Sequence, residues 1–361
     1  MLSEWFGVAR WTYNQAVQAV KAGKSTVNLT SLRNLFVNST SDAVKERPYL
    51  TKVPYEIRSD VCRDFKKGFS VAKTRLRKGD IPKFEMKFRS RKDRQQSIYM
   101  CARAFSSKNN FFYTTYFGKD EWMKSSEPLP DKVDGDCRLL KTKTGKYFLV
   151  MPVKKKVVEQ KKEREKIAAL DPGVRTFQSV YSPEGSFIEI GPNAISRIFR
   201  LCKHYDDLQS RWTKVRAKKR RRMRKAGLRL QEKIRNLVKE MHNTTAKRLC
   251  ERFETILIPK FDTQKMTKKE SRVIGSKTAK AMLTWSHYTF RQRLISKAEE
   301  MGTHVEVVNE AYTSKTCGNC GHLHRNLGKS KKFKCPRCNY EVDRDFNGAR
   351  NILIKKICER R

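Results

Sequence analysis

The amino-acid sequence predicts an α+β protein of several domains, and three observations support this prediction. First, 361 residues with 38% hydrophobic and 10% aromatic content can bury a sizeable core and divide into two or three domains. Second, apolar residues recur at helical spacing in residues 1–80, whereas short strand-like runs and turns follow in 81–165. Third, apolar strands alternate with helical segments in 166–361, and a compact cysteine module occupies 312–342.

The composition is dominated by positive charge, because 81 Lys and Arg residues against 37 Asp and Glu give a net charge of +44. Such a surface repels itself and argues against an enzyme that acts on small metabolites. A polyanion balances it most simply, and nucleic acid rewards many dispersed cations through counterion release. Disorder is the alternative, but the hydrophobic content, with only 17 Gly and 11 Pro, argues against it.

The sequence predicts neither a membrane span nor a secretory signal. No window of about 18 apolar residues is present, and residues 1–7 lack a basic stretch followed by an apolar run. We therefore expect a reducing compartment, in which six scattered cysteines are free and mostly buried thiols: Cys62, Cys101, Cys137, Cys202, Cys250 and Cys358.

The first predicted helices are amphipathic. Their apolar residues recur every three or four positions, as in Trp5, Ala9, Tyr13, Ala16 and Val20, and again in Val61, Phe65, Phe69 and Ala72. We expect these residues to form the face through which the helices pack.

The segment 82–94 interleaves cations with Phe84 and Phe88 and precedes strand-like runs at 111–117 and 146–153. Its candidate nucleic-acid ligands are Lys83, Lys87, Arg89 and Arg91. Such a segment can grip RNA through charge and stacking. An ordinary edge strand with basic decoration is an equally good interpretation.

Beyond a charged connector at 154–166, the sequence predicts one long helix over 196–253 and a second helical segment over 280–301. A short helix that begins at Asp345 closes the chain. The remaining apolar runs predict buried strands at 167–170, 177–181, 185–190, 255–258 and 304–308.

The densest basic run lies within the long helix, where ten of the fifteen residues from Arg211 to Lys225 are Lys or Arg and none is acidic. A solvated helix face, a nuclear localisation signal and a rail for nucleic-acid phosphates are the three interpretations. We favour the rail for most of the charge, with these candidate ligands: Lys214, Arg216, Lys218, Lys219, Arg220, Arg221, Arg222, Arg224 and Lys225.

Four cysteines are arranged as two C-x2-C pairs separated by fourteen residues, Cys317 with Cys320 and Cys335 with Cys338. Each pair can direct two thiolates at one ion, and two pairs complete a tetrahedral zinc site. With all four positions filled by thiolates, the zinc would be structural. A pair of disulfides is the alternative, which the absence of a secretory signal disfavours.

Three carboxylates stand at the ends of predicted core elements, namely Asp171, Glu310 and Asp345. Taken singly, Asp171 before Pro-Gly is usually a turn former, Asp345, like Asp343, an N-cap, and Glu310 a solvated strand end. Together, in a chain of charge +44, they indicate a Mg²⁺ site. Two such ions about 3.5–4 Å apart can activate water and stabilise a leaving phosphodiester oxygen.

These residues lie in motifs by which nearly the whole chain resembles the TnpB/Fanzor family of RNA-guided DNA endonucleases, relatives of the type V CRISPR nucleases. Tyr312–Gly321 and Asp343–Ile352 are similar to the family's highly specific T-S-x-T-C-x-x-C-G and D-R-D-x-N-A-A-x-N-I motifs. Asp171–Gly173 is similar to its first RuvC-type motif. Phe6–Asn14 is similar to its F-G-x-x-R-x-x-Y-N helix, and Pro82–Ser97 to the basic P-x-F segment before the wedge domain.

The chain departs from the TnpB pattern after its second motif. There TnpB-like proteins place their catalytic Glu in an E-D-L sequence, but here 255–258 is followed by Pro259, Lys260 and Phe261. Fanzor proteins move this Glu to a nearby strand, and Glu310 fits that relocation. The chain therefore resembles Fanzor more than TnpB.

Asp262 is the reserve candidate for the missing ligand, because Glu254 flanks the wrong end of the strand. A second departure is that the family's first wedge strand does not precede the helix near Phe6. We therefore expect an incomplete wedge domain or a truncated start.

The resemblance implies a domain organisation. Residues 1–80 would form a helical recognition domain and 81–165 a β-barrel-like wedge domain. Residues 166–361 would form an RNase H-like, RuvC-type α/β nuclease domain, with the zinc ribbon 312–342 inserted in it.

The resemblance also implies a reaction. A monomeric ribonucleoprotein would carry an omega-type guide RNA and cut both strands of double-stranded target DNA beside a short flanking motif. Asp171, Glu310 and Asp345 would be the catalytic ligands of two Mg²⁺ ions, and the helix that contains 211–225 would lie beside the guide–target heteroduplex. A Fanzor-like protein would work in the nucleus of a eukaryotic host or be encoded by a virus.

Three alternatives remain at this point. An RNA-guided DNA-binding protein without cleavage would explain the loss of a carboxylate at Pro259. A general zinc-ribbon nucleic-acid-binding protein would explain the charge and the cysteines but not the ordered carboxylates. A strand-transfer transposase would explain the carboxylates, but the basic helix and the ribbon in the last third favour the guided nuclease.

Overall fold

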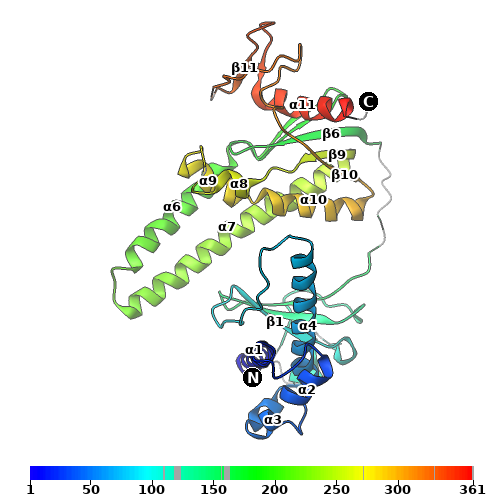
Figure 1. Ribbon diagram of the computed structural model, residues 1–361, viewed down its shortest axis with the longest axis vertical. Coiled ribbons are helices and arrows are strands. Elements are labelled where there is room, and N and C mark those ends of the chain that lie inside the picture. The colour runs from blue at the N-terminus through cyan, green and yellow to red at the C-terminus, as the bar shows by residue number, and fades with distance from the viewer. Residues whose placement is uncertain are drawn as a thin grey trace. The chain divides into compact units, whose positions relative to one another are not determined.

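The computed structural model describes residues 1–108, 110–117, 123–155, 157, 163–270, 272–328 and 330–359. Part of the predicted connector therefore lies outside the described residues. The chain forms two compact units, Met1–Lys154 and Lys155–Arg361 (Figure 1). No helix of the described residues is long and apolar enough to cross a bilayer.

The first unit begins with helices, as predicted: α1 (Leu2–Lys21), α2 (Leu29–Phe36), α3 (Asp42–Lys45), the 3-10 helix η1 (Pro48–Lys52) and α4 (Tyr55–Arg77). On α1, Trp5, Ala9 and Tyr13 are buried, as their spacing predicts. The rings of Tyr13 and Phe65 of α4 meet edge-on, with centroids 5.8 Å apart. The apolar stripes of α1 and α4 therefore form their contact.

An antiparallel sheet completes this unit in the order β1-β4-β5. Its strands are β1 (Gln95–Met100), β4 (Cys137–Thr142) and β5 (Tyr147–Val150), and the smaller elements are η2 (Ala102–Ala104), β2 (Ser107–Lys108), β3 (Phe111–Phe112) and α5 (Thr114–Phe117). The predicted strand at 111–117 is wrong beyond Phe112. Tyr113 has a φ of 52°, a left-handed conformation that ends the extended chain, and a helical turn follows.

The second unit is built on a mixed five-stranded sheet in the order β10-β9-β6-β7-β8. These strands are β6 (Glu165–Pro172), β7 (Gln178–Tyr181), β8 (Phe187–Ile190), β9 (Phe253–Pro259) and β10 (His304–Val308), as the sequence predicts. Strands β6, β9 and β10 are parallel to one another, β7 is antiparallel to β6, and β8 is antiparallel to β7. The carboxyl ends of the three parallel strands therefore meet at one edge.

Helices cover both faces of this sheet: α6 (Ala194–Trp212), α7 (Ala217–Arg252), α8 (Thr263–Thr267), α9 (Ser276–Trp285), α10 (His287–Met301) and α11 (Arg344–Cys358). On one face Leu170 and Ile256 pack in a core with residues of α6, α7, α9 and α10. On the other, Ala169 and Leu257 pack with Ile352 of α11. Alternate residues along each strand thus face opposite helical layers.

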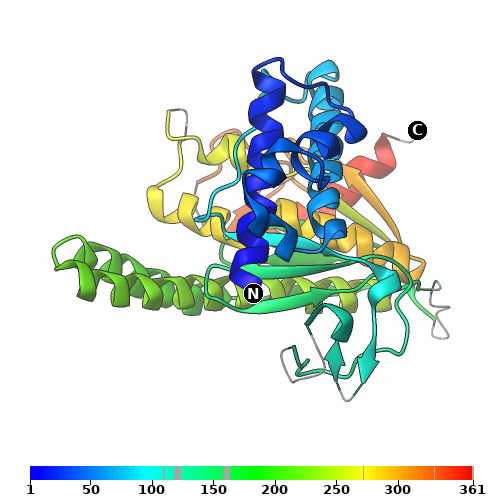
Figure 2. The ribbon, with the colours of Figure 1, turned by 90° about the horizontal axis from the view of Figure 1, so that it is seen from below.

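The predicted single helix over 196–253 is wrong, because the chain reverses at Thr213–Arg216 and forms a hairpin of α6 and α7 (Figures 1 and 2). Arg220 stabilises the turn by donating to the carbonyls of Trp212 and Val215 at 3.1 Å each. The hairpin closes over Gly227, where a Cβ atom would lie 2.7 Å from the Trp212 ring. Similarly, the helical segment 280–301 is divided at Ser286, whose φ is 52°.

We predict that Gly227→Ala destabilises the hairpin, although Ala favours a helix by about 1 kcal/mol. The added methyl group has no room against Trp212, and overpacking of this kind costs about 1–3 kcal/mol. Gly7→Ala is the matched control, because Gly7 is also helical but nothing lies within 4 Å of its Cβ position. Urea unfolding of both variants measures the difference, and equal stabilisation of both would contradict the steric argument.

Candidate active site

Asp171 lies near the carboxyl end of β6 and points toward α11. Residues on one face of a strand alternate, so Asp171 shares the face of Ala169, which packs with α11. A Cβ atom on Gly348 of α11 would lie 2.4 Å from Asp171 Oδ2, so glycine leaves the space that the carboxylate occupies. Sequence reasoning missed Gly348 as a site residue, because its role becomes visible only through this contact with Asp171, which is distant in the sequence.

Glu310 follows β10. Val308, the last residue of β10, packs on the α11 side with Leu257 and pairs with Pro259 in the parallel register. Glu310 comes two residues later, and its negative charge raises the pKa of Asp171, so the two carboxyls lie near each other. Pro259 is the last residue of β9, so that strand ends without a carboxylate beside Val308.

Asp345 comes from the first turn of α11. Its neighbour Asp343 is the N-cap, because the Asp343 side chain accepts from the backbone N–H groups of Asp345 and Phe346 at 2.9 and 3.1 Å. The capping role that sequence reasoning offered to both aspartates thus belongs to Asp343. The Asp345 side chain makes no cap, and burial, followed by repulsion from Asp343, raises its pKa.

The three carboxylates interact electrostatically. Burial, together with the negative charges of Asp345 and Glu310, raises the pKa of Asp171 to about 8, and Arg344 opposes this shift. Burial also raises the pKa of Glu310, opposed by the backbone amide of Phe261 and the charge of Arg291. A cation bound among these acids would relieve their repulsion, and an all-oxygen donor set suits a hard ion such as Mg²⁺.

In the part of the chain that the structure describes, the group of three or more possible metal ligands whose ligand atoms all lie within 4.8 Å of one another is formed by the four cysteines.

The reserve candidate Asp262 has another role. Its side chain accepts from the Lys265 backbone N–H at 3.2 Å and caps α8. Glu254 is exposed near the start of β9, away from the carboxyl edge. Neither residue contributes to the electrostatics of Asp171.

The four cysteines form a cluster with the dimensions of a zinc site. The Sγ atoms of Cys317 and Cys338 are 3.7 Å apart, and those of Cys320 and Cys335 are 3.6 Å apart. A tetrahedron with Zn–S bonds of about 2.3 Å has edges of about 3.8 Å, so the thiols fit this ion. The ribbon around them contains β11 (Lys332–Lys334) and β12 (Glu341–Asp343), which pair antiparallel.

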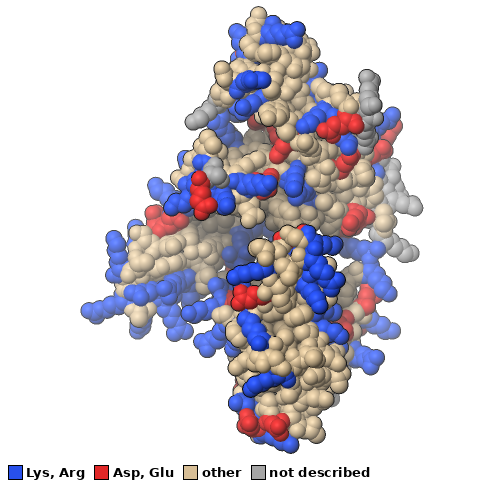
Figure 3. Space-filling model, in the orientation of Figure 1, with Lys and Arg blue, Asp and Glu red and all other residues tan. Residues whose placement is uncertain are grey.

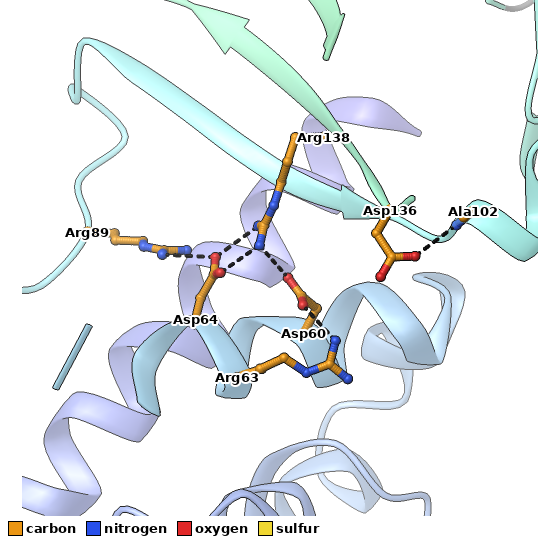
Figure 4. Close-up of polar contacts among 7 residues, drawn as sticks. All are labelled: Asp60, Arg63, Asp64, Arg89, Ala102, Asp136 and Arg138. Carbon is orange, nitrogen blue, oxygen red and sulfur yellow. Dashed lines mark hydrogen bonds and ion pairs between the residues drawn. The ribbon is translucent and has the colours of Figure 1, made fainter. Parts of the chain in front are cut away.

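The candidate nucleic-acid ligands in 82–94 differ in the exposure of their side chains and in their contacts with the rest of the protein. Lys83, Lys87 and Arg91 are exposed, whereas Arg89 is half-buried. Arg89 pairs with Asp64 at 3.3 Å and stacks 3.9 Å from the Tyr13 ring centroid. Figure 4 shows Asp64 and Asp60 of α4 held between Arg89, Arg138 and Arg63, so Arg89 anchors its segment to α4.

The candidates on the α6–α7 hairpin are exposed, with the exception of the half-buried Arg220, which holds the turn. Figure 3 shows Lys and Arg gathered over this hairpin. The start of α7 thus presents exposed cations of the kind that neutralise nucleic-acid phosphates.

Comparison with known proteins identifies the relatives of this chain. The protein A625R of Paramecium bursaria Chlorella virus 1, which bears the name of a transposase, is 30% identical over 372 residues that cover 98% of this chain and 83% of that protein. The TnpB-like protein L770 of Acanthamoeba polyphaga mimivirus is 27% identical over 98% of this chain and 70% of that protein. This chain belongs to the TnpB/IS605 transposase family.

Two family models locate the TnpB features. Residues 150–270, which include Asp171, match OrfB_IS605, described as "Probable transposase". Residues 287–352, which include Glu310, the cysteine cluster and Asp345, match the "Cas12f1-like, TNB domain". The endodeoxyribonuclease Cas12f1 of Sulfoacidibacillus thermotolerans is 40% identical over 88 residues, 24% of this chain and 20% of that protein. The residues matched by the two family models thus contain the three acids and the four cysteines of the candidate site.

We predict that this TnpB-family chain holds one zinc ion in its cysteine cluster. Cys335→Ser should abolish stoichiometric zinc and lower the thermal stability of the ribbon, because removal of one thiolate opens the tetrahedron. Cys358→Ser is the matched control, since Cys358 is exposed on α11 and outside the cluster. Elemental analysis of the purified full-length proteins measures the metal, and zinc retained by Cys335→Ser would refute the assignment.

We predict that the Mg²⁺-free, zinc-loaded chain loses stability as the pH rises from about 4 to about 8. The folded-state pKa of Asp171, about 8, lies above its ordinary value of 3.8, so the folded state retains a proton that the unfolded state releases. The asparagine side chain of Asp171→Asn cannot titrate, so this variant should flatten the dependence of stability on pH. Its gain in melting temperature over the wild type should be larger at pH 8 than at pH 5. Parallel curves for wild type and variant from pH 5 to 8 would contradict the prediction.

Proposed function

We propose that this protein is an RNA-guided DNA endonuclease that hydrolyses target DNA with Mg²⁺ at Asp171, Glu310 and Asp345. The observation that carries the proposal is that acids from β6, β10 and α11 lie on one face at the carboxyl edge of the sheet and raise the pKa of the buried Asp171. A stable fold gains nothing from buried like charges, but a cation-dependent site needs them.

Each acid has a distinct task in this reaction. Bound Mg²⁺ would lower the pKa of the attacking water and stabilise the leaving oxygen. Asp171, whose pKa both other acids raise, would hold the bound Mg²⁺ together with them. Glu310 and Asp345 would supply the further oxygen ligands, and the glycine at position 348 leaves the space that the Asp171 carboxylate occupies.

The nucleic-acid partners follow from the charge and from the relatives. A Cas12f1 relative is named a CRISPR-associated endodeoxyribonuclease, and a guide RNA with double-stranded target DNA suits a chain of charge +44. The exposed basic residues of α7 would follow the heteroduplex backbone. Lys83, Lys87 and Arg91 would contact RNA or the DNA beside the target, whereas Arg89 acts through its anchoring contacts.

The remaining expectations complete the proposal. The first unit would comprise the recognition helices and a wedge-like sheet, and the second an RNase H-like nuclease domain with a structural zinc ribbon. The protein would act as a monomeric ribonucleoprotein. Relatives encoded by viruses that infect eukaryotes are compatible with action in the nucleus of such a host.

We predict that the purified ribonucleoprotein cleaves a guide-matched DNA from a library of randomised flanking sequences in the presence of Mg²⁺. Sequencing the co-purified RNA supplies the guide. Asp171→Ala and Glu310→Gln should each lower the cleavage rate by more than the roughly 10–100-fold that outer-shell changes produce, because each removes a direct ligand. Asp262→Asn is the matched control, since Asn preserves the α8 cap.

The same cleavage assay distinguishes the alternative functions. Guided binding without cleavage by the wild type would identify a nuclease-inactive binding protein. Binding that ignores the guide would identify a general zinc-ribbon protein, and joined DNA ends would identify a strand-transfer transposase. Full activity of Glu310→Gln with loss of activity in Asp262→Asn would return the third ligand to Asp262.

A further inference from the structure

The turn after β9 is unusual in its backbone. Lys260 donates its N–H to the Val308 carbonyl of β10 at 3.3 Å, which joins the turn to the strand that leads to Glu310. The next residue, Phe261, has a φ of 38°, a left-handed conformation that a bulky side chain rarely adopts. Such a conformation persists only where surrounding contacts enforce it.

The first two turns of α10 supply those contacts. Arg291 donates from Nη1 to the Lys260 carbonyl. The Phe261 ring meets the His287 ring edge-on, with centroids 4.9 Å apart and an interplanar angle of 75°. Burial lowers the pKa of His287 to about 3, so this ring is neutral and serves as a packing surface rather than a proton carrier.

The braced turn faces Glu310. The backbone N–H of Phe261 donates a hydrogen bond to the Glu310 carboxyl, and the Arg291 guanidinium lies close enough to interact with it electrostatically. Arg291, which holds the turn through the Lys260 carbonyl, therefore also interacts with Glu310.

We propose that Arg291 and Phe261 are positioning residues for Glu310: they hold the 259–261 turn in the conformation that orients this carboxylate as a metal ligand. The proposal rests on the proposed function, which makes Glu310 a ligand, and it extends that function to residues outside the three acids. Where β9 presents Pro259 in place of an acid, the turn that follows supports the acid of the neighbouring strand instead.

Binding of Mn²⁺ to the full-length, zinc-loaded chain, followed by the EPR signal of free Mn²⁺, tests this proposal without relying on cleavage. Arg291→Gln and Phe261→Ala should each weaken binding by about tenfold or more, as outer-shell changes at metal sites do. Arg291→Lys should restore part of the affinity, because the lysine ammonium can still donate to the Lys260 carbonyl. Arg293→Gln is the matched control: Arg293 lies on the same helix but bonds to Lys239 and Asn243, and its loss should change affinity less than twofold.

Melting temperatures identify variants that do not fold. If Arg291→Gln does not fold, the Mn²⁺ affinities of Phe261→Ala and Arg291→Lys decide the question. Wild-type Mn²⁺ affinity in Arg291→Gln and Phe261→Ala, with affinity lost in Glu310→Gln, would overturn the positioning role and leave the proposed nuclease intact. Affinity lost in all three, with no guided cleavage by the wild type, would support the positioning role and reject the nuclease. An equal loss in Arg293→Gln would show that α10 acts only through general stability.

Discussion

The parallel pairing of β6, β9 and β10 is the constraint on which the rest of the site depends. Its register brings three carboxyl strand ends to one edge, and the two-residue period of each strand decides which side chains face α11. Asp171 and Glu310 are 139 residues apart in the chain, yet Glu310 lies near enough to raise the pKa of Asp171, because β6 and β10 both end at this edge. A one-residue slip would direct either acid into the opposite helical layer.

The position of Asp345, on α11, depends on side-chain hydrogen bonds rather than on strand register. Asn347 of α11 accepts from the Gly318 N–H at 3.0 Å and donates to the Thr316 carbonyl at 2.8 Å, and Asn351 donates to the Thr313 and Thr316 carbonyls at 2.9 and 2.6 Å. These bonds tie α11 to the segment that enters the zinc ribbon. The ribbon therefore controls where α11 begins, and with it where Asp345 lies.

Much of this arrangement could be predicted because it is local. The strands and the cysteine spacing are each readable from a few neighbouring residues, whereas the choice of Glu310 came from the resemblance to Fanzor proteins and stays a prediction. The break of the long helix was missed because its turn depends on Trp212 packing over Gly227, a contact between two helices. Gly348, Arg291 and the anchoring of Arg89 by Asp64 were missed for the same reason, since each is defined by a partner distant in sequence.

The move of the third acid to β10 has a consequence for the chain between the ligands. Glu310 lies seven residues before Cys317, and Asp345 lies seven residues after Cys338. The cysteine cluster therefore closes the loop that joins two of the three proposed ligands. Zinc bound there, as we propose, would meet much of the entropy of ordering that loop. A zinc-free chain would have to order the loop as it gathers Mg²⁺, so the occupancy of the cysteine cluster would set the effective affinity of the acids for Mg²⁺.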